Sequence, residues 1–252
     1  MQLEEITFCV KTFNRYSTLW RCLWSLQNFA PQCPVIVCDD STEPQEYPKN
    51  IQNRIQIIRP EPDVGVSVGR NLMVENVKTK YAFILDDDHA ISKGTNFGAA
   101  VKSIPKDWET GIIAFPLFHH KKGYAGASRF TVKKTPSGKI VDIVATLENP
   151  VDIAVNNFVA PTGLLLENPW PPELKVGEHF VWFWDLFEKG QVKIYCMPRR
   201  HSWYHMIGDP AREHISYKRY RSRPTHEKVR AFSKRKIHSI KWIPLGKNKQ
   251  IS

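Results

Sequence analysis

Short apolar runs separated by polar turns make up the first third of the chain. They span residues 6–10, 35–38, 55–58 and 81–85, and each is apolar almost throughout. Uninterrupted runs of this length predict strands buried on both faces of a parallel sheet. Apolar residues at helical spacing follow Ser17, a candidate N-cap, and recur over 66–77. This order of strands and helices, with short connections, predicts a doubly wound α/β sheet.

Beyond residue 91 the pattern is less regular. We expect a helix over 94–103, strands over 112–118 and within 158–166, and a last strand over 192–196. The turn Pro136-Ser137-Gly138 separates two further strand-like runs, 130–132 and 140–145, and so predicts a hairpin. An aromatic-rich helix is expected over 177–188, closed by Gly190.

The charge of the chain is concentrated at its end. The chain has 252 residues, a net charge of +11 and 42% hydrophobic residues, which suits one large domain or a domain with an appendage. After about residue 208, 13 Lys and Arg residues stand against only three acids. We therefore predict a domain over 1–208 and a basic C-terminal extension over 209–252.

The five cysteines predict a reducing compartment. They are Cys9, Cys22, Cys33, Cys38 and Cys196, an odd set without the spacing of a metal site. Cys9 and Cys38 lie inside apolar runs, where a free thiol behaves as a small hydrophobic group. The N-terminus lacks the pattern of a signal peptide, and no apolar run approaches the ~18 residues of a membrane span. We expect a cytoplasmic protein without disulfides.

Three consecutive carboxylates, Asp86, Asp87 and Asp88, end the apolar run at 81–85. Open α/β sheets bind ligands at the carboxyl ends of their strands. Carboxylates this close repel one another, and a divalent cation such as Mg²⁺ or Mn²⁺ removes the conflict. The second strand also ends in two acids, Asp39 and Asp40. The alternative interpretation of the triplet is a solvated acidic turn.

Four segments resemble, in order, the nucleotide-binding half of the GT-A glycosyltransferases, especially the large inverting family two. They are ITFCVKTFNR, VIVCDDST, GVSVGRNLMVENV and FILDDDHAI, which together cover about residues 5–91. The third resembles the family's G-x-x-x-A-R-N helix, with Gly69 where alanine is usual. The fourth resembles the strand that carries the D-x-D signature. The resemblance implies a GT-A fold, with a nucleotide-binding half over about 1–91 and an acceptor half over about 92–208.

The resemblance also implies a UDP-sugar site and a metal. Its nucleotide-sugar positions are Thr12, Asn14, Arg15, Asp39, Asp40, Arg70, Asp86 and Asp87. Asp39 or Asp40 can accept hydrogen bonds from the uracil imide and a ribose hydroxyl, and the resemblance favours Asp39. Arg70 would bind a phosphate or brace the acids. Mn²⁺ or Mg²⁺ would be held by Asp88 and Asp86, with a late histidine, for which His205 fits better than His201.

The segment from Trp170 to His179 resembles the W-x-x-x-L-x-x-G-E-H segment of β-N-acetylgalactosaminyltransferase-type enzymes. In related enzymes an acid at the start of this helix is the general base, a role that requires the ionised carboxylate. A helix N-terminus favours that ionised form. His179 stands where a second acid is usual, which leaves Glu178 and His179 as candidates, and we favour Glu178.

The basic extension has three interpretations. Residues near Tyr217, Arg219, Tyr220, Arg221 and Arg223 could order over a diphosphate. The extension could also rest on an anionic membrane surface, or bind nucleic acid. We favour the first two together, and a solvated helix is the alternative.

The sequence as a whole predicts a metal-dependent inverting glycosyltransferase. It would move a hexosyl or N-acetylhexosaminyl group from a UDP-sugar to a hydroxyl of a glycan or glycolipid, as in polysaccharide biosynthesis. One alternative is a nucleotidyltransferase, although the turn at 11–15 lacks the Gly-rich phosphate loop of that class. Another is a catalytically silent protein that binds membrane or nucleic acid through its basic extension.

Overall fold

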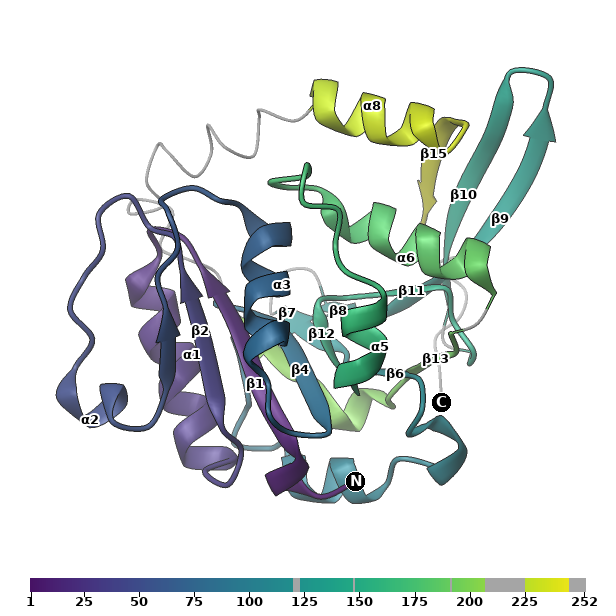
Figure 1. The fold of residues 1–252 in the computed structure, drawn as a ribbon. Helices are drawn as coiled ribbons and strands as arrows, with labels where there is room; N and C mark the ends of the chain where they lie inside the picture. The colour runs from purple at the N-terminus through teal and green to yellow at the C-terminus, as the bar shows by residue number, and fades with distance from the viewer. Residues whose placement is uncertain (120–122, 147, 191, 207–224, 245–252) are drawn as a thin grey trace.

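A seven-stranded sheet forms the centre of the molecule (Figure 1). The computed structural model describes residues 1–119, 123–146, 148–190, 192–206 and 225–244. The strands of the central sheet, in spatial order, are β13 (Ile194–Cys196), β6 (Ile112–Ala114), β12 (Asn157–Pro161), β4 (Tyr81–Asp86), β1 (Ile6–Thr12), β2 (Val35–Asp39) and β3 (Gln56–Ile58). All neighbours run parallel except β12, which is antiparallel to β4 and β6. The predicted α/β class with a mostly parallel sheet is confirmed.

Helices cover both faces of this sheet, and each face has its own apolar core. The helices are α1 (Tyr16–Phe29), α2 (Lys49–Gln52), α3 (Val66–Asn76), α4 (Phe97–Lys102), α5 (Thr162–Glu167), α6 (Glu178–Lys189) and α8 (Thr225–Lys234), with 3₁₀ turns η1 (Leu3–Glu5), η2 (Lys106–Trp108) and η3 (Arg199–His201). Side chains alternate along a strand, so Phe8 packs with α1 and α4 while Cys9 packs with α3. The strands are apolar throughout because both faces are buried.

Two smaller sheets complete the fold. One contains β11 (Ile153–Ala154), β9 (Ala127–Thr135), β10 (Gly138–Thr146) and β15 (Ile237–Ile243). The other contains β5 (His89–Ala90), β14 (Trp203–His205), β7 (Leu117–His119) and β8 (Gly123–Ala125). The predicted hairpin is the antiparallel pair β9–β10, which Figure 1 shows projecting from the body of the molecule.

One sequence prediction in the second half was wrong. The run 112–118 is two strands in different sheets, β6 and β7, separated by Pro116, which cannot donate a ladder hydrogen bond. The strand expected within 158–166 is confirmed as β12, although it ends at Pro161, after which α5 begins. The local apolar pattern did not show where this strand ends and the helix begins.

The described part of the basic extension is packed against the protein. Strand β15 runs parallel to β10, and Arg235 on the turn before it donates to both carboxylate oxygens of Asp185 on α6, each at 2.5 Å. The Phe232 ring lies 5.5 Å from Phe180, also on α6. Residues 225–244 therefore complete a sheet and brace α6. The division at residue 208 stays a prediction, and Tyr217, Arg219, Tyr220, Arg221 and Arg223 lie outside the described residues.

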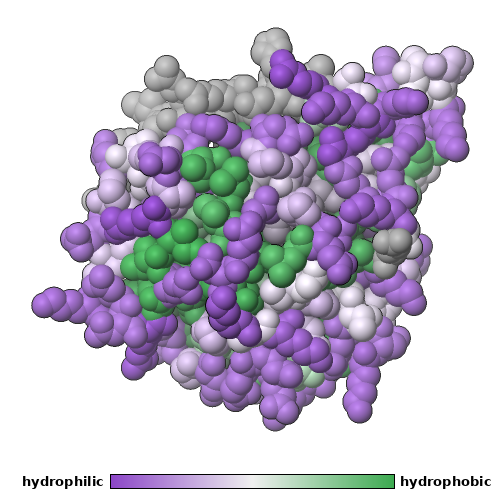
Figure 2. All heavy atoms as spheres, in the orientation of Figure 1, coloured by the Kyte–Doolittle hydropathy of each residue, from purple (hydrophilic) through white to green (hydrophobic). Residues whose placement is uncertain are grey.

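Two further expectations bear on compartment and surface. All five cysteines are free. Within the described ranges, no helix is long and apolar enough to cross a membrane. On the face shown in Figure 2, hydrophobic residues gather over the region of β1, β2, β3 and α3.

Candidate functional site

The carboxyl ends of β1, β2 and β4 bring the predicted polar residues to one edge of the sheet. In the parallel register, Thr12 on β1 pairs with Asp39 on β2, and Lys11 pairs with Asp86 on β4. Adjacent strands lie about 4.8 Å apart, so these residues are neighbours in space. The turns that follow each strand carry the remaining acids.

Arg70 connects two of the predicted acids. It lies on α3 and is 1% exposed. Its Nη1 donates to Oε1 of Glu178 at 2.5 Å, and its Nη2 donates to Oδ1 of Asp86 at 2.8 Å. The guanidinium also lies 5.7 Å from the Trp170 ring centroid. Of the two roles predicted for Arg70, this geometry supports bracing of the acids, because both terminal nitrogens already have carboxylate partners.

Asp87 points into the protein. It is fully buried, accepts a hydrogen bond from Thr12 Oγ1 at 2.7 Å, and pairs with the Arg15 guanidinium. Burial raises the pKa of Asp87 to about 6, and the Arg15 charge only partly offsets that effect. Asp87, Thr12 and Arg15 thus form the internal support of the acidic turn, and the sequence alone did not distinguish this support from direct nucleotide contact.

Asp88, His89 and His205 form a candidate metal centre. Their nearest ligand atoms all lie within 4.8 Å of one another. His89 Nε2 is 3.5 Å from Asp88 Oδ1, and His205 Nε2 is 3.6 Å from Asp88 Oδ2. Although burial opposes ionisation, hydrogen bonding from His205 and the charge of Arg15 hold the pKa of Asp88 well below its usual range. One carboxylate and two imidazoles suit Mn²⁺ or another first-row divalent ion.

The pairing of β5 with β14 builds this centre, since His205 lies opposite His89 in the ladder. The sequence had placed Asp86 beside Asp88 as a ligand, but the cluster contains His89 instead, and Asp86 bonds to Arg70. The missed signal was the histidine directly after the acidic triplet. His119 is 9% exposed on β7, and its ring centroid lies 5.5 Å from that of His205.

Asp40 is held by the protein itself. Lys11 pairs with its Oδ1, and the Gly65 N–H donates to its Oδ2 at 2.9 Å. A methyl group at Gly69 would stand 2.3 Å from Cε of Lys11. The glycine at the family's alanine position therefore makes room for a buried lysine that neutralises Asp40.

Asp39 lies under two tyrosines. Tyr16 and Tyr47 donate to its Oδ2 at 2.7 and 3.2 Å, and Ser41 Oγ donates to its Oδ1 at 2.5 Å. Burial raises the pKa of Tyr47 above its ordinary value, so its hydroxyl remains a donor. Asn14, at φ 54, joins the turns after β1 and β2 through its N–H to Ser41 Oγ at 2.9 Å.

Glu178 and His179 begin α6 and differ in environment. Glu178 is 4% exposed, and Arg70 contacts its Oε1, while Oε2 makes no hydrogen bond to the described residues. His179 Nδ1 lies 2.6 Å from Asn156 Oδ1. Burial lowers the pKa of His179 to about 4, so its imidazole is neutral at pH 7 and a weak base. Of the two base candidates, this geometry supports Glu178.

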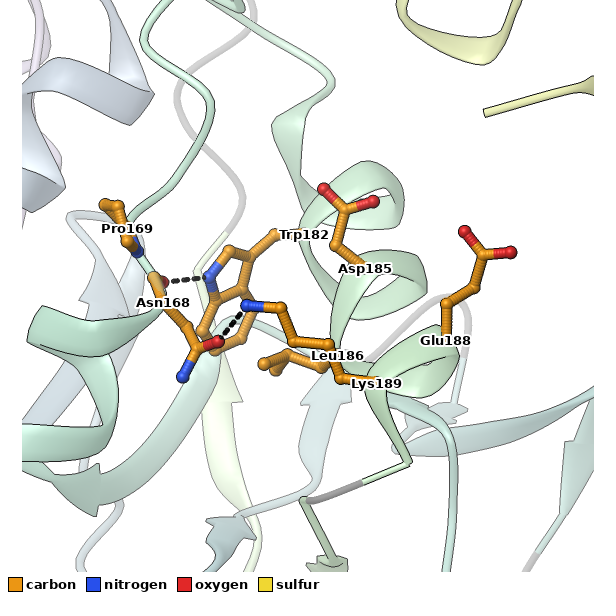
Figure 3. A pocket seen from close by; sticks show the side chains of 7 residues that line it. All are labelled: Asn168, Pro169, Trp182, Asp185, Leu186, Glu188 and Lys189. Carbon is orange, nitrogen blue, oxygen red and sulfur yellow. Dashed lines mark hydrogen bonds between the residues drawn. The ribbon is translucent and has the colours of Figure 1, made fainter. Parts of the chain in front are cut away.

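Two hollows lie near these elements, and neither is lined by the acids of the candidate site. A pocket of about 350 Å³ lies against α6, and its lining residues, drawn in Figure 3, are Asn168, Pro169, Trp182, Asp185, Leu186, Glu188 and Lys189. The backbone oxygen of Asn168 accepts from Trp182 Nε1, and its side chain accepts from Lys189. These bonds hold the loop before α6. A second hollow of about 480 Å³ runs between α1 and the β5–β14 pair, beside Ala90 and Tyr204.

Part of the chain matches a known protein family. Residues 7–126 match the family model described as "Glycosyl transferase family 2". The mouse protein "Beta-1,4 N-acetylgalactosaminyltransferase 2" is 34% identical over 101 residues, which are 40% of this chain and 19% of that protein. The rat protein "Beta-1,4 N-acetylgalactosaminyltransferase 1" is 26% identical over 197 residues, 71% of this chain and 35% of that protein. The chain therefore spans about a fifth to a third of the length of these curated relatives.

Solved structures share the fold at low identity. TarS of S. aureus aligns with a TM-score of 0.57 and 18% identity, covering 82% of this chain and 37% of that chain. GalNAc-T7 "with UDP, GalNAc and Mn2+" aligns with a TM-score of 0.58 and 15% identity, covering 81% and 44%. At these identities the similarity establishes the GT-A fold of the described chain.

Proposed function

We propose that this chain, which carries a glycosyl transferase family 2 domain of the GT-A fold, transfers a sugar from a UDP-sugar to an acceptor hydroxyl with inversion. Its curated relatives are named as N-acetylgalactosaminyltransferases, and two similar structures are titled as complexes with UDP. These names favour a UDP-hexose or UDP-N-acetylhexosamine donor, and the acceptor we propose is a glycan or glycolipid.

The bridge from Asp86 through Arg70 to Glu178 carries this proposal. Asp86 ends the strand where the donor diphosphate would lie, and Glu178 begins a helix 92 positions later in the chain. One buried guanidinium contacts both carboxylates, at 2.8 and 2.5 Å. The candidate base therefore stands one side chain away from the candidate donor site, as a displacement at the donor's anomeric carbon requires.

In the proposed reaction Glu178 removes the proton from the acceptor hydroxyl. Its Oε1 stays with Arg70, and Oε2 takes the proton. The acceptor oxygen then bonds to the anomeric carbon from the face opposite the diphosphate, and the bond from that carbon to the diphosphate oxygen breaks. Both electrons of the broken bond leave with UDP. The positioned carboxylate supplies ~10²–10⁴-fold of rate, the usual contribution of such a group.

Residues on the other side of the site would hold the donor. Asp39 would accept from the uracil imide, with Asn14 setting the turn beside it. Asp88, His89 and His205 would hold Mn²⁺ or Mg²⁺, and the donor set fits Mn²⁺ better because imidazole suits first-row transition ions. When bound, the ion would neutralise the charge that develops on the departing diphosphate. Arg15 keeps Asp88 ionised for that role.

The basic surface would bring the enzyme to its acceptor. On the described part of the extension, Arg230, Lys236 and Lys241 are exposed, and Lys133 on the adjoining hairpin is 68% exposed at its side chain. Lys and Arg near an anionic lipid surface each contribute about 1 kcal/mol. A peripheral contact with anionic membrane would suit an enzyme that acts on glycolipids.

Nucleotide-sugar binding is the direct test. Differential scanning fluorimetry would measure the Tm of the protein with UDP, UDP-GalNAc, UDP-GlcNAc and UDP-glucose in the presence of Mn²⁺. UDP and the true donor should raise the Tm, because a ligand that binds only the folded state stabilises it. Release of UDP in the presence of glycan acceptors should follow for the donor that binds. A protein that binds none of these nucleotides at millimolar concentration would exclude the proposed donor class.

A further inference from the structure

The carboxylate of Asp39 has no acceptor site left for a nucleobase. An ionised carboxylate offers about four lone-pair sites, two on each oxygen. Ser41 fills those on Oδ1, through its N–H at 3.2 Å and its hydroxyl at 2.5 Å. Tyr16 and Tyr47 fill those on Oδ2, through hydroxyls at 2.7 and 3.2 Å. Asp39 is only 3% exposed, so the four donors also cover it.

Three of these four donors are fixed by the backbone around them. Ser41 is two residues from Asp39 and bonds to it through both main chain and side chain. Tyr16 is the first residue of α1, whose 14 residues are anchored in the core beside the sheet. None of these three could leave Asp39 without moving an element that forms the site.

Tyr47 is the donor that can leave. It lies in a segment without helix or strand between β2 and α2. Its bond to Asp39, at 3.2 Å, is the longer of the two tyrosine bonds. The ring packs edge-on against Trp20 at 4.9 Å, and the Arg59 guanidinium lies 5.6 Å from its centroid. These side-chain contacts hold the ring over Asp39, and Tyr47 could move away without breaking any pairing between strands.

We infer that Tyr47 is a specificity-determining residue that occupies the nucleobase position on Asp39 and must release it when the donor binds. This inference rests on the proposed function, in which Asp39 accepts from the uracil imide. The phenolic O–H and the imide N–H present the same group to the carboxylate, a single hydrogen-bond donor on an aromatic ring. A base without such a donor could not replace the Tyr47 hydroxyl, and Asp39 would keep its present partner.

Competition from the Tyr47 hydroxyl should therefore lower the apparent affinity for UDP. When only a fraction of the protein has a free acceptor on Asp39, the apparent Kd is the intrinsic Kd divided by that fraction. Removing the competing hydroxyl while keeping the ring should raise the fraction toward one. Tyr47→Phe does this, because Phe retains the packing against Trp20 and leaves one lone-pair site of Oδ2 open.

Calorimetric titration of the full chain with UDP in Mn²⁺ tests the inference. We expect Tyr47→Phe to bind UDP ~3–10-fold more tightly than wild type, the effect of losing one competing hydrogen bond. Binding of 3-methyl-UDP, which lacks the imide N–H, should not improve. The matched control is Tyr16→Phe, which removes the shorter bond from a fixed helix and should give a smaller gain. Tyr47→Leu also lacks the hydroxyl and repeats the test if the Phe variant does not fold.

The other outcomes separate this inference from the proposed function. Unchanged or weaker UDP binding in Tyr47→Phe, with wild-type affinity intact, would overturn the role of Tyr47 and leave the UDP-sugar assignment standing. Equal gains for UDP and 3-methyl-UDP would also overturn it, because the improvement would not depend on the imide. Absence of UDP binding in the wild type and both Phe variants would overturn the two together.

Discussion

The two halves of the candidate site are assembled in different ways. Asp39 and Asp86 reach it at the ends of neighbouring parallel strands, where register alone makes them neighbours. Glu178 and His205 come from the second half of the chain, on a helix and on a two-residue ladder with β5. The first half is positioned by the sheet, and the second half is positioned by side-chain contacts between distant segments.

This difference shows in what holds each acid. Asp40 and Asp87 of the first half are buried and paired with cations of the same half, Lys11 and Arg15. Glu178 has its cation, Arg70, 108 residues away. Its helix is braced by Arg235, which lies 50 residues beyond its partner Asp185 in the chain. The second half should therefore be more sensitive to single side-chain changes.

The largest effect is expected at Glu178. Glu178→Gln retains an oxygen for Arg70 but cannot take a proton at neutral pH, so kcat should fall ~10²–10⁴-fold. UDP affinity should stay near wild type, because the donor contacts lie on the other half of the site. Steady-state kinetics together with calorimetry separate the two quantities. Glu173→Gln, an exposed acid just before the same helix, is the control. A Glu178→Gln protein with wild-type kcat would exclude Glu178 as the base.

The next effect is expected at Asp88 in the first half. Asp88→Asn removes the charge shared by His89, His205 and Arg15, and Mn²⁺-dependent UDP affinity should fall by ~10–100-fold or more. UDP binding without metal should change little. Titrations with and without Mn²⁺ measure both. Asp86→Asn should lower the Mn²⁺-dependent UDP affinity less than Asp88→Asn does, because Asp86 bonds to Arg70 rather than to the histidines. An equal loss of Mn²⁺-dependent UDP affinity in the two variants would mean that Asp86 is also a metal ligand.

A smaller effect is expected at the brace behind α6. The pair Arg235–Asp185 is bidentate, but the Asp185 side chain is 35% exposed, so the pair should contribute only about 1 kcal/mol. A double-mutant cycle of Arg235→Gln and Asp185→Asn, followed by urea unfolding, isolates that coupling. The same variants should lower kcat more than UDP affinity if the brace positions Glu178. If the cycle gives no coupling energy, the Arg235–Asp185 pair does not stabilise the protein and does not brace α6.

The last effect is expected from His179 and appears only as a dependence of stability on pH. Its pKa is about 4 in the folded protein and ~6.5 when unfolded, so between these values the unfolded chain binds more protons. Stability therefore rises with pH across this window and is lost on acidification. His179→Asn should flatten that rise by at most ~1 kcal/mol per pH unit in urea unfolding between pH 4.5 and 7. Exposed His238→Asn is the control, and a slope equal to wild type would show that His179 titrates normally.

The first half of the fold could be predicted from sequence because its signals are local. Apolar runs at 6–10, 35–38 and 81–85 are strands, and the helix expected over 66–77 is Val66–Asn76. Parallel pairing then places every strand end at the same edge. The second half gave weaker signals, since one apolar run was split by Pro116 between two sheets and another continued into α5.

The sequence by itself determined the α/β class, the acidic edge of the sheet and the residues available there, because apolar periodicity and strand-end acids are properties of short segments. Only the tertiary structure decided the partners of those residues. In the folded protein Asp86 bonds to Arg70, His89 lies beside His205, and Tyr47 covers Asp39. Such pairings depend on long-range packing and on which cation can be buried beside which acid. Lys11 beneath Gly69 is the clearest case, because a single absent methyl group decides where a charge lies.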